Sequence, residues 1–180
     1  MNLISQENSI FLIIDVQEKL VNMLSDSCVK DSAVKLAKTA SILNLPVIIS
    51  EQYPKGLGQT IQEIKDVCVN ADYLEKTSFS IYNQEDFVNL LKNKNRKQVI
   101  LFGIETHICV LQTAFDLVNN GYEVFVVKDA CGSRVQDNKD LALNRMQQNG
   151  IQVLSLEMVL FELLNSSKHE KFKDVQALIK

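Results

Sequence analysis

The most informative segment of this 180-residue chain reads Gln98-Val-Ile-Leu-Phe-Gly-Ile-Glu-Thr-His-Ile-Cys109-Val110. After Gln98, residues 99–102 are all apolar, which is typical of a strand that is covered on both faces. The segment then passes into an amphipathic pattern over residues 106–120, which predicts a long helix. A buried strand that leads into a helix in this way is the repeating unit of a parallel α/β sheet.

The same alternation continues along the whole chain. Strands are predicted over residues 10–15, 46–50, 73–75, 98–102, 123–127 and 151–154. Helices are predicted over residues 27–44, 60–67, 84–92, 106–120, 138–148, 156–164 and 170–179, and two of them end in Asn-Gly, the expected C-cap chemistry. Helices between consecutive strands imply right-handed crossovers, so the sequence predicts an α/β fold, a three-layer αβα sandwich with a six-stranded parallel, Rossmann-like sheet.

Composition narrows the class of protein. The chain is 46% hydrophobic and 23% charged, which suits one globular domain over residues 1–180. Its formal net charge of -3 provides no broad cationic field, so we expect no nucleic-acid partner. The longest apolar runs, at residues 10–14 and 124–127, are far shorter than the ~20 residues that span a bilayer, so we expect no membrane partner either.

The cysteines suggest a reducing compartment. Four cysteines are present without a CxxC pair or His/Cys metal spacing, and the N-terminal residues lack the layout of a secretion signal. Free thiols and a cytoplasmic location are therefore expected.

Three chemically useful side chains follow predicted strands. Asp15 ends the first strand, Lys76 follows the short third strand, and Cys109 lies in the first turn of the predicted helix 106–120. In a parallel sheet, ligands bind beyond the carboxyl ends of the strands, so these groups are expected to share one cleft. The positive end of the helix dipole and Lys76 would favour a Cys109 thiolate, and Asp15 could accept its proton or orient a water.

Each residue also has an ordinary interpretation. Cys109 lies between apolar neighbours and could simply belong to the core. Asp15 could cap the turn that follows it, and Lys76 could be solvated or form a structural ion pair with Asp15.

With these motifs in view, the chain resembles the isochorismatase-like cysteine hydrolases, a family that includes nicotinamidases and carbamoylsarcosine amidohydrolases. The resemblance covers nearly the whole chain, and within the family it is strongest to the small isochorismatase-domain-containing proteins. The ordered motifs that carry it are Ile14-Asp-Val-Gln17, Ser50-Glu-Gln-Tyr-Pro-Lys-Gly-Leu-Gly58, Lys76-Thr-Ser-Phe-Ser80, Gly103-Ile-Glu-Thr-His-Ile-Cys-Val110, Asp129-Ala-Cys-Gly-Ser-Arg134 and His169-Glu-Lys-Phe-Lys173.

The resemblance implies a role for each site residue. It makes Asp15 the general base, Lys76 the polarising partner and Cys109 the nucleophile. It also implies a cis peptide bond between Ile104 and Glu105, and an oxyanion hole formed by the backbone amides of Glu105 and Cys109. The implied activity is hydrolysis of a small amide-like molecule through a thioester, and the implied assembly is a homo-oligomer.

The chain departs from the nicotinamidase pattern at the metal site. Where those enzymes carry an Asp-x-His cluster, this chain reads Ser50-Glu-Gln-Tyr53, so neither a metal nor another cofactor is expected. His107 suggests a histidine-based triad as an alternative, but side chains two residues apart on a helix do not share a face.

Several interpretations stay open at this point. Gln17, Tyr53, Phe79 and Tyr82 could line a substrate pocket or serve only in packing. Cys131, placed after the fifth strand, could be a second reactive thiol or a small core residue. The main alternative to a hydrolase is a catalytically silent binding or scaffold protein with a redox-sensitive thiol. A dinucleotide-binding enzyme is a third possibility, but this chain has no GxGxxG motif after its first strand.

Overall fold

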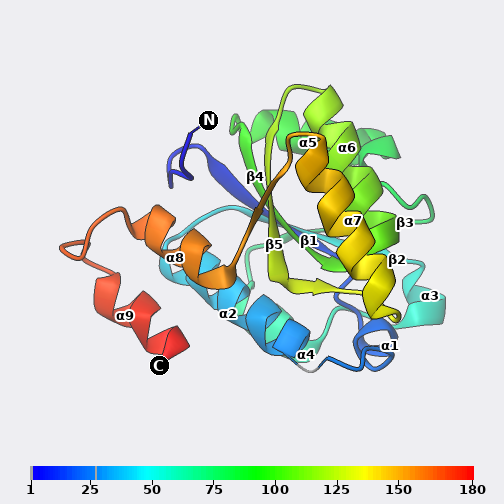
Figure 1. Ribbon diagram of the computed structural model, residues 1–180, viewed down its shortest axis with the longest axis horizontal. Coiled ribbons are helices and arrows are strands. Elements are labelled where there is room, and N and C mark those ends of the chain that lie inside the picture. The colour runs from blue at the N-terminus through cyan, green and yellow to red at the C-terminus, as the bar shows by residue number, and fades with distance from the viewer. Residues whose placement is uncertain (1, 27) are drawn as a thin grey trace.

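The computed structural model describes residues 2–26 and 28–180, and its centre is one parallel sheet (Figure 1). The predicted fold class is confirmed, because six strands pair in the order β3-β2-β1-β4-β5-β6, all of them parallel. The strands are β1 (Ser9–Ile14), β2 (Val47–Gln52), β3 (Asp72–Lys76), β4 (Gln98–Ile104), β5 (Glu123–Gly132) and β6 (Gln152–Leu154).

Helices cover both faces of this sheet. Figure 1 shows α5, α6 and α7 gathered on one side and α2, α4 and α8 on the other, with α9 beyond α8 at the end of the chain. The helices are α1 (Glu18–Val21), α2 (Cys28–Ile42), α3 (Pro54–Leu57), α4 (Gln62–Val67), α5 (Glu85–Asn93), α6 (Leu111–Asn119), α7 (Gln136–Gln148), α8 (Leu156–Leu164) and α9 (Phe172–Gln176). Short 3₁₀ turns span Ile81–Asn83 and Ala177–Ile179, and a π-helical turn spans Thr106–Val110.

The central strands form where the sequence is most continuously apolar. All six residues of β1 and all seven of β4 are buried, as expected for strands packed on both faces. The predicted Asn-Gly helix ends are confirmed as well. Gly121 and Gly150 follow α6 and α7 with φ near +81°, a conformation that glycine adopts without a steric penalty.

Strand order reverses between β1 and β4. From β1 the chain moves outward through β2 to β3, and then returns to place β4 on the other side of β1. Open α/β sheets bind ligands beside such a reversal, beyond the carboxyl ends of the strands. Asp15 follows β1 at this point, and Cys109 follows β4.

Some predicted boundaries are wrong. Strand β5 continues to Gly132, so Cys131 lies inside the strand and not after it. Its pairing with β4 shifts register between Leu101 and Gly103, which lengthens β5 beyond its apolar run. The predicted helix 106–120 is divided into the π turn and α6, and the predicted start of the first helix at Ser27 lies outside the described residues. Within residues 2–26 and 28–180, no helix is long and apolar enough to cross a membrane.

Candidate active site

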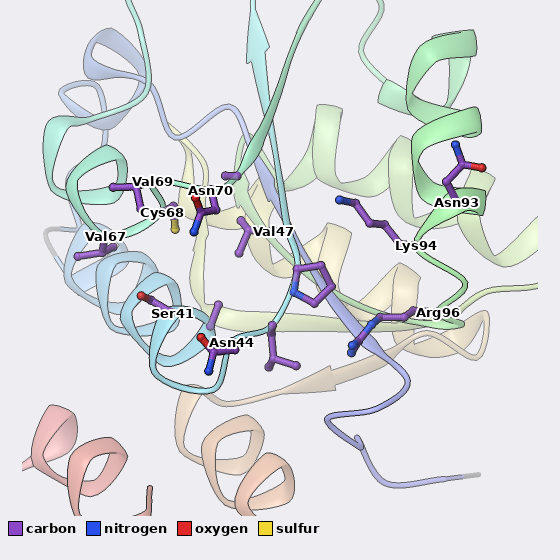
Figure 2. Close-up of a pocket in the computed structure, with 14 residues that line it drawn as sticks. Ser41, Asn44, Val47, Val67, Cys68, Val69, Asn70, Asn93, Lys94 and Arg96 are labelled. Atoms are coloured by element: carbon purple, nitrogen blue, oxygen red, sulfur yellow. The ribbon is translucent and has the colours of Figure 1, made fainter.

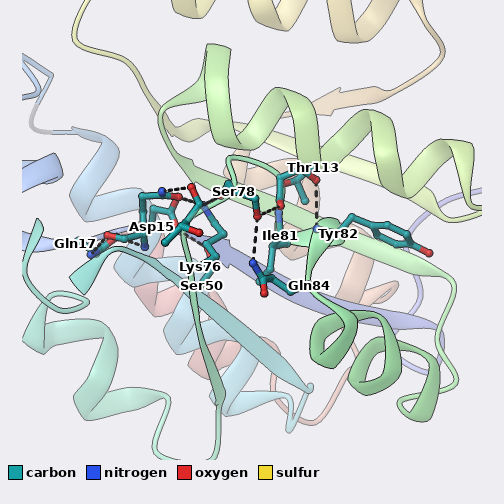
Figure 3. A network of polar contacts seen from close by, with 12 residues as sticks. Asp15, Gln17, Ser50, Lys76, Ser78, Ile81, Tyr82, Gln84 and Thr113 are labelled. Carbon is teal, nitrogen blue, oxygen red and sulfur yellow. Dashed lines mark hydrogen bonds and ion pairs between the residues drawn. The ribbon is translucent and has the colours of Figure 1, made fainter. Parts of the chain in front are cut away.

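Asp15 and Lys76 form a fully buried ion pair at the carboxyl edge of the sheet. Lys76 Nζ lies 2.7 Å from Asp15 Oδ2, and both side chains have 0% exposure. Asp15 leaves β1 with a φ of 52°, and Lys76 is the last residue of β3, two strands away. Figure 3 shows the two side chains meeting across the end of β2.

The ammonium group has three acceptors for its three protons. Besides Asp15, Lys76 Nζ donates to Gln52 Oε1 at 2.6 Å and to the Ser78 carbonyl at 3.4 Å. Ser50 Oγ donates to the other Asp15 oxygen at 2.6 Å. A buried charge is stable only with such partners, so the pair and its neighbours form one satisfied network.

Cys109 completes the cluster from the π turn. Its thiol lies close enough to Asp15 and Lys76 for both to shift its pKa through charge and hydrogen bonding, and the residue is only 7% exposed. The structure therefore brings together Asp15, Lys76 and Cys109, the three residues singled out in the sequence.

The protonation state of Cys109 differs from the sequence-based expectation. Burial and the charge of Asp15 raise the pKa of the Cys109 thiol to about 12, and Lys76 lowers it only in part. Burial raises the pKa of Asp15 too, against the opposing effect of Lys76. Cys109 is thus a neutral thiol with the Asp15 carboxyl group beside it.

The backbone before Cys109 is held by hydrogen bonds. The Ile104–Glu105 peptide bond is cis, and the Glu105 carbonyl accepts hydrogen bonds from the amides of Ile108 at 3.1 Å and Val110 at 3.3 Å. Among the described residues, no protein group accepts a hydrogen bond from the Glu105 amide. The donor capacity of that amide is thus unused by the described residues.

Gly103 allows β4 to approach β1 beside this turn. It pairs with Ile14 and has a φ of +137°, and a Cβ at this position would lie 1.9 Å from the Ile14 carbonyl oxygen. Only glycine fits such a close backbone approach. The contact brings the residue that precedes Asp15 next to the segment that leads to Cys109.

The four predicted pocket residues have different environments. Gln17 is buried, and its side chain binds the backbone at the end of β2. It accepts a hydrogen bond from the Gln52 amide at 2.7 Å and donates one to the Gln52 carbonyl at 3.1 Å. Tyr53 and Phe79 are exposed at 56% and 53%. Tyr82 points away from Asp15 in Figure 3 and packs edge-on against Phe87, so the structure does not bring it to the cluster.

Two cavities lie at opposite edges of the sheet. A cavity of about 270 Å³ lies beside Lys76 and is lined by Tyr53, Pro54, Lys55, Glu75, Lys76, Thr77 and Gln84. A larger one of about 570 Å³, drawn in Figure 2, includes Asn44, Asn70 and Arg96. These residues precede strands β2, β3 and β4, so the larger cavity is at the amino edge of the sheet, opposite the cluster.

No site role was predicted from the sequence for Arg134, which binds the Glu105 carboxylate, or for the network partners Ser50 and Gln52. Ser50 and Gln52 are polar residues at the carboxyl end of an otherwise apolar strand, which is the same signal that singled out Asp15. At the position of the nicotinamidase metal cluster, they instead hold Asp15 and Lys76. Over residues 2–26 and 28–180, no group of three or more His, Cys, Asp or Glu side chains could hold a metal ion.

The other sequence candidates have structural partners. His107 Nδ1 lies 3.0 Å from Ser133 Oγ, which gives the ring a partner outside the cluster. Cys131 is fully buried within β5, and burial raises the pKa of its thiol to about 12, so it is a core residue.

Comparisons with known proteins show the family to which the chain belongs. Residues 9–158 match the isochorismatase domain family. Isochorismatase domain-containing protein 2 of Xenopus laevis is 39% identical over 180 residues, which cover 98% of this chain and 85% of that protein.

Two solved structures extend the comparison. A Caenorhabditis elegans protein described as the MAR1 ribonuclease is 37% identical, with a TM-score of 0.93 over 99% of this chain and 92% of that one. The YcaC protein of Escherichia coli, described as an octameric hydrolase of unknown specificity, is 26% identical, with a TM-score of 0.89 over 98% of this chain and 94% of that one.

Proposed function

Because this chain belongs to the isochorismatase family of hydrolases, we propose that it is a metal-independent cysteine hydrolase of small amide-like substrates. The proposal treats residues 1–180 as one hydrolase domain. The observation that carries it is the buried meeting of Asp15, Lys76 and Cys109 at the strand reversal. A carboxylate, an ammonium group and a thiol in one buried cluster suit nucleophilic catalysis better than a purely structural role.

The reaction begins with proton transfer from the Cys109 thiol to Asp15. Because the resting thiol is neutral, this transfer creates the thiolate only when it is needed, and the total charge of the site stays the same. Lys76 stabilises whichever partner is anionic. The sulfur then attacks the carbonyl carbon of the substrate and forms a tetrahedral oxyanion.

The oxyanion is held by the backbone amides of Glu105 and Cys109. The Glu105 amide supports this role because it has no acceptor among the described residues, and an oxyanion hole needs donors that no protein acceptor already occupies. When the C–N bond breaks, the departing amine takes the proton from Asp15 and leaves a thioester on Cys109. Asp15 then removes a proton from water, which attacks the thioester and releases the carboxylic acid and the thiol.

The test uses Cys109→Ala and a panel of small primary amides, with ammonia release as the readout. We expect the wild-type protein to release ammonia from at least one amide, and the variant to lose that activity. A covalent adduct of the acyl mass on Cys109, detected by mass spectrometry after rapid quenching, would support the thioester. If Cys109→Ala keeps full turnover of that amide, the covalent mechanism is wrong.

A silent binding or scaffold protein is the second candidate. The burial of Cys109 and its raised thiol pKa favour it, since both slow a free thiol. Reaction with an activated ester such as p-nitrophenyl acetate distinguishes a hydrolase from a silent protein. A hydrolase acylates Cys109 and gives a rapid burst of p-nitrophenolate, whereas a silent protein gives the same slow release as Cys109→Ala.

RNA is a further compound to include, because one structural neighbour is described as a ribonuclease. The net charge of -3 favours a small molecule over a polyanion. Cleavage of RNA that is lost in Cys109→Ala would replace the amide proposal.

The proposal includes homo-oligomeric assembly and a cytoplasmic location. An octameric neighbour supports assembly, as do the exposed apolar side chains Val135, Leu141, Met158 and Phe161 on and beside α7 and α8. The native mass from light scattering tests it. Four free cysteines support a reducing compartment, and imaging of the tagged protein in cells tests the location.

A further inference from the structure

The carboxylate of Glu105 is held at three points by a single residue. Arg134 donates from Nε to Oε1 at 2.9 Å, from Nη2 to Oε2 at 3.2 Å, and from its own backbone amide to Oε1 at 3.0 Å. Glu105 is only 6% exposed, whereas the Arg134 side chain is 55% exposed. The exposed arginine thus neutralises and orients a buried carboxylate 29 residues away in the sequence.

Topology explains how the two residues meet. Ile104 pairs with Gly132 at the ends of β4 and β5, so the chain leaving each strand starts from the same place. Glu105 then enters the π turn that carries Cys109, and Arg134 enters the connection to α7. A second contact, His107 Nδ1 to Ser133 Oγ at 3.0 Å, joins the same two segments.

Within the part of the chain that the structure describes, these contacts leave one polar group of Glu105 without a protein partner. Its carboxylate is held by Arg134 and its carbonyl by the amides of Ile108 and Val110, while no described group accepts from its own amide. The Glu105 side chain and carbonyl are thus both anchored close to this amide. Arg134 is therefore the residue that holds the Glu105 side chain in place.

We propose that Arg134 is a positioning residue for the oxyanion hole, and that it acts through the Glu105 carboxylate without touching the substrate. This inference rests on the proposed function, because it assigns the Glu105 amide to oxyanion binding. It also gives a use to the Ser133-Arg134 end of the Asp129–Arg134 motif, which the three-residue cluster leaves unexplained. The arginine is chemically suited to the task, since its planar fork fixes a carboxylate at two points and a lysine cannot.

The experiment compares two reactions of Cys109 that differ in their need for an oxyanion hole. Acylation by p-nitrophenyl acetate passes through a tetrahedral oxyanion, whereas alkylation by iodoacetamide is a direct displacement at carbon and forms none. Arg134→Met and Arg134→Lys are compared with Arg145→Met, which removes an exposed arginine from α7. Each rate is measured on the full chain at one pH.

We expect Arg134→Met to slow acylation by roughly tenfold to a hundredfold, since removal of one oxyanion donor costs at least about a hundredfold and a misdirected donor costs less. Alkylation should change by less than about twofold, because the thiol and Asp15 keep their places. Arg134→Lys should show an intermediate acylation rate, and Arg145→Met should match the wild type. Methylguanidinium added to Arg134→Ala should restore part of the lost acylation rate.

Different outcomes overturn different claims. Equal acylation by the wild type and Arg134→Met would overturn the positioning role. Equal slowing of acylation and alkylation in Arg134→Met would also overturn it, because the arginine would then act on the thiol or on folding. If the wild type itself shows no acylation above Cys109→Ala, the proposed function fails first.

Discussion

At the scale of single residues, Asp15 has two opposite effects on Cys109. Its negative charge raises the pKa of the thiol, while its oxygen is the acceptor that can remove the thiol proton. Asp15→Asn separates the two effects. We expect the variant to lose turnover and yet to have a thiol with a lower pKa than the wild type, because Lys76 remains and the opposing charge is gone.

The rate of iodoacetamide labelling as a function of pH measures this shift. For the wild type, the rate should rise about tenfold per pH unit through the alkaline range, as expected for a thiol with a raised pKa. The Asp15→Asn profile should level off at lower pH, and that of the exposed Asp137→Asn should match the wild type. A profile that Asp15→Asn leaves unmoved would contradict the coupling between the two residues.

The meeting of the three candidate residues at one edge of the sheet could be predicted from the sequence, but their charge states could not. Asp15, Lys76 and Cys109 each follow a predicted strand, so parallel-sheet topology alone brings them to one edge. The degree of burial and the contacts of Lys76 with Gln52 and Ser78 depend on side-chain packing, which a sequence pattern does not contain. For this reason the thiolate expected from the sequence is a neutral thiol in the structure.

At the scale of elements, the meeting of β1 and β4 depends on Gly103. Its positive φ would cost an alanine about 1–2 kcal/mol, and the clash of a Cβ with the Ile14 carbonyl would add about 1–3 kcal/mol. Gly121→Ala is the matched control, because Gly121 also has a positive φ but no described atom lies within 4 Å of the position that its Cβ would take. We expect Gly103→Ala to lower the free energy of unfolding by at least about 2 kcal/mol more than Gly121→Ala.

Urea unfolding followed by circular dichroism measures both variants, and similar slopes with denaturant keep the comparison valid. If Gly103→Ala and Gly121→Ala lose the same free energy of unfolding, β1 can move away from β4 without an energetic cost. Gly103→Ala should also lower the acylation rate of Cys109 in the folded protein. The added Cβ would push β1 away from β4 and so move Asp15 relative to the π turn.

Elements with strong local signals were predicted well, and those set by tertiary contacts were not. The apolar strand cores and the Asn-Gly caps are local, and the structure confirms them. The π turn at Thr106–Val110 and the extension of β5 to Gly132 depend on pairing between distant segments. The turn has no periodicity of its own, so its residues read as the start of α6.

At the scale of the whole molecule, three buried thiols make the free energy of unfolding decrease as the pH rises into the alkaline range. Burial raises the pKa of Cys68 to about 11 and those of Cys109 and Cys131 to about 12. In the unfolded chain the thiols titrate near ~8.5. Because the folded pKa values are higher, the stability from these groups is fully present below pH ~8.5 and is lost as pH rises toward the folded values.

Each thiol that ionises only in the unfolded chain lowers the free energy of unfolding by about 1.4 kcal/mol per pH unit, so three lower it by about 4 kcal/mol per unit. Urea unfolding in reducing buffer between pH 8 and pH 10.5 should show this decline. Cys131→Ala should reduce the slope by about a third, whatever its effect on stability at neutral pH. The slope separates the titration of Cys131 from the packing it provides, since a lost packing contact shifts the curve equally at every pH. Identical slopes in the wild type and Cys131→Ala would mean that this thiol reaches water before the sheet unfolds.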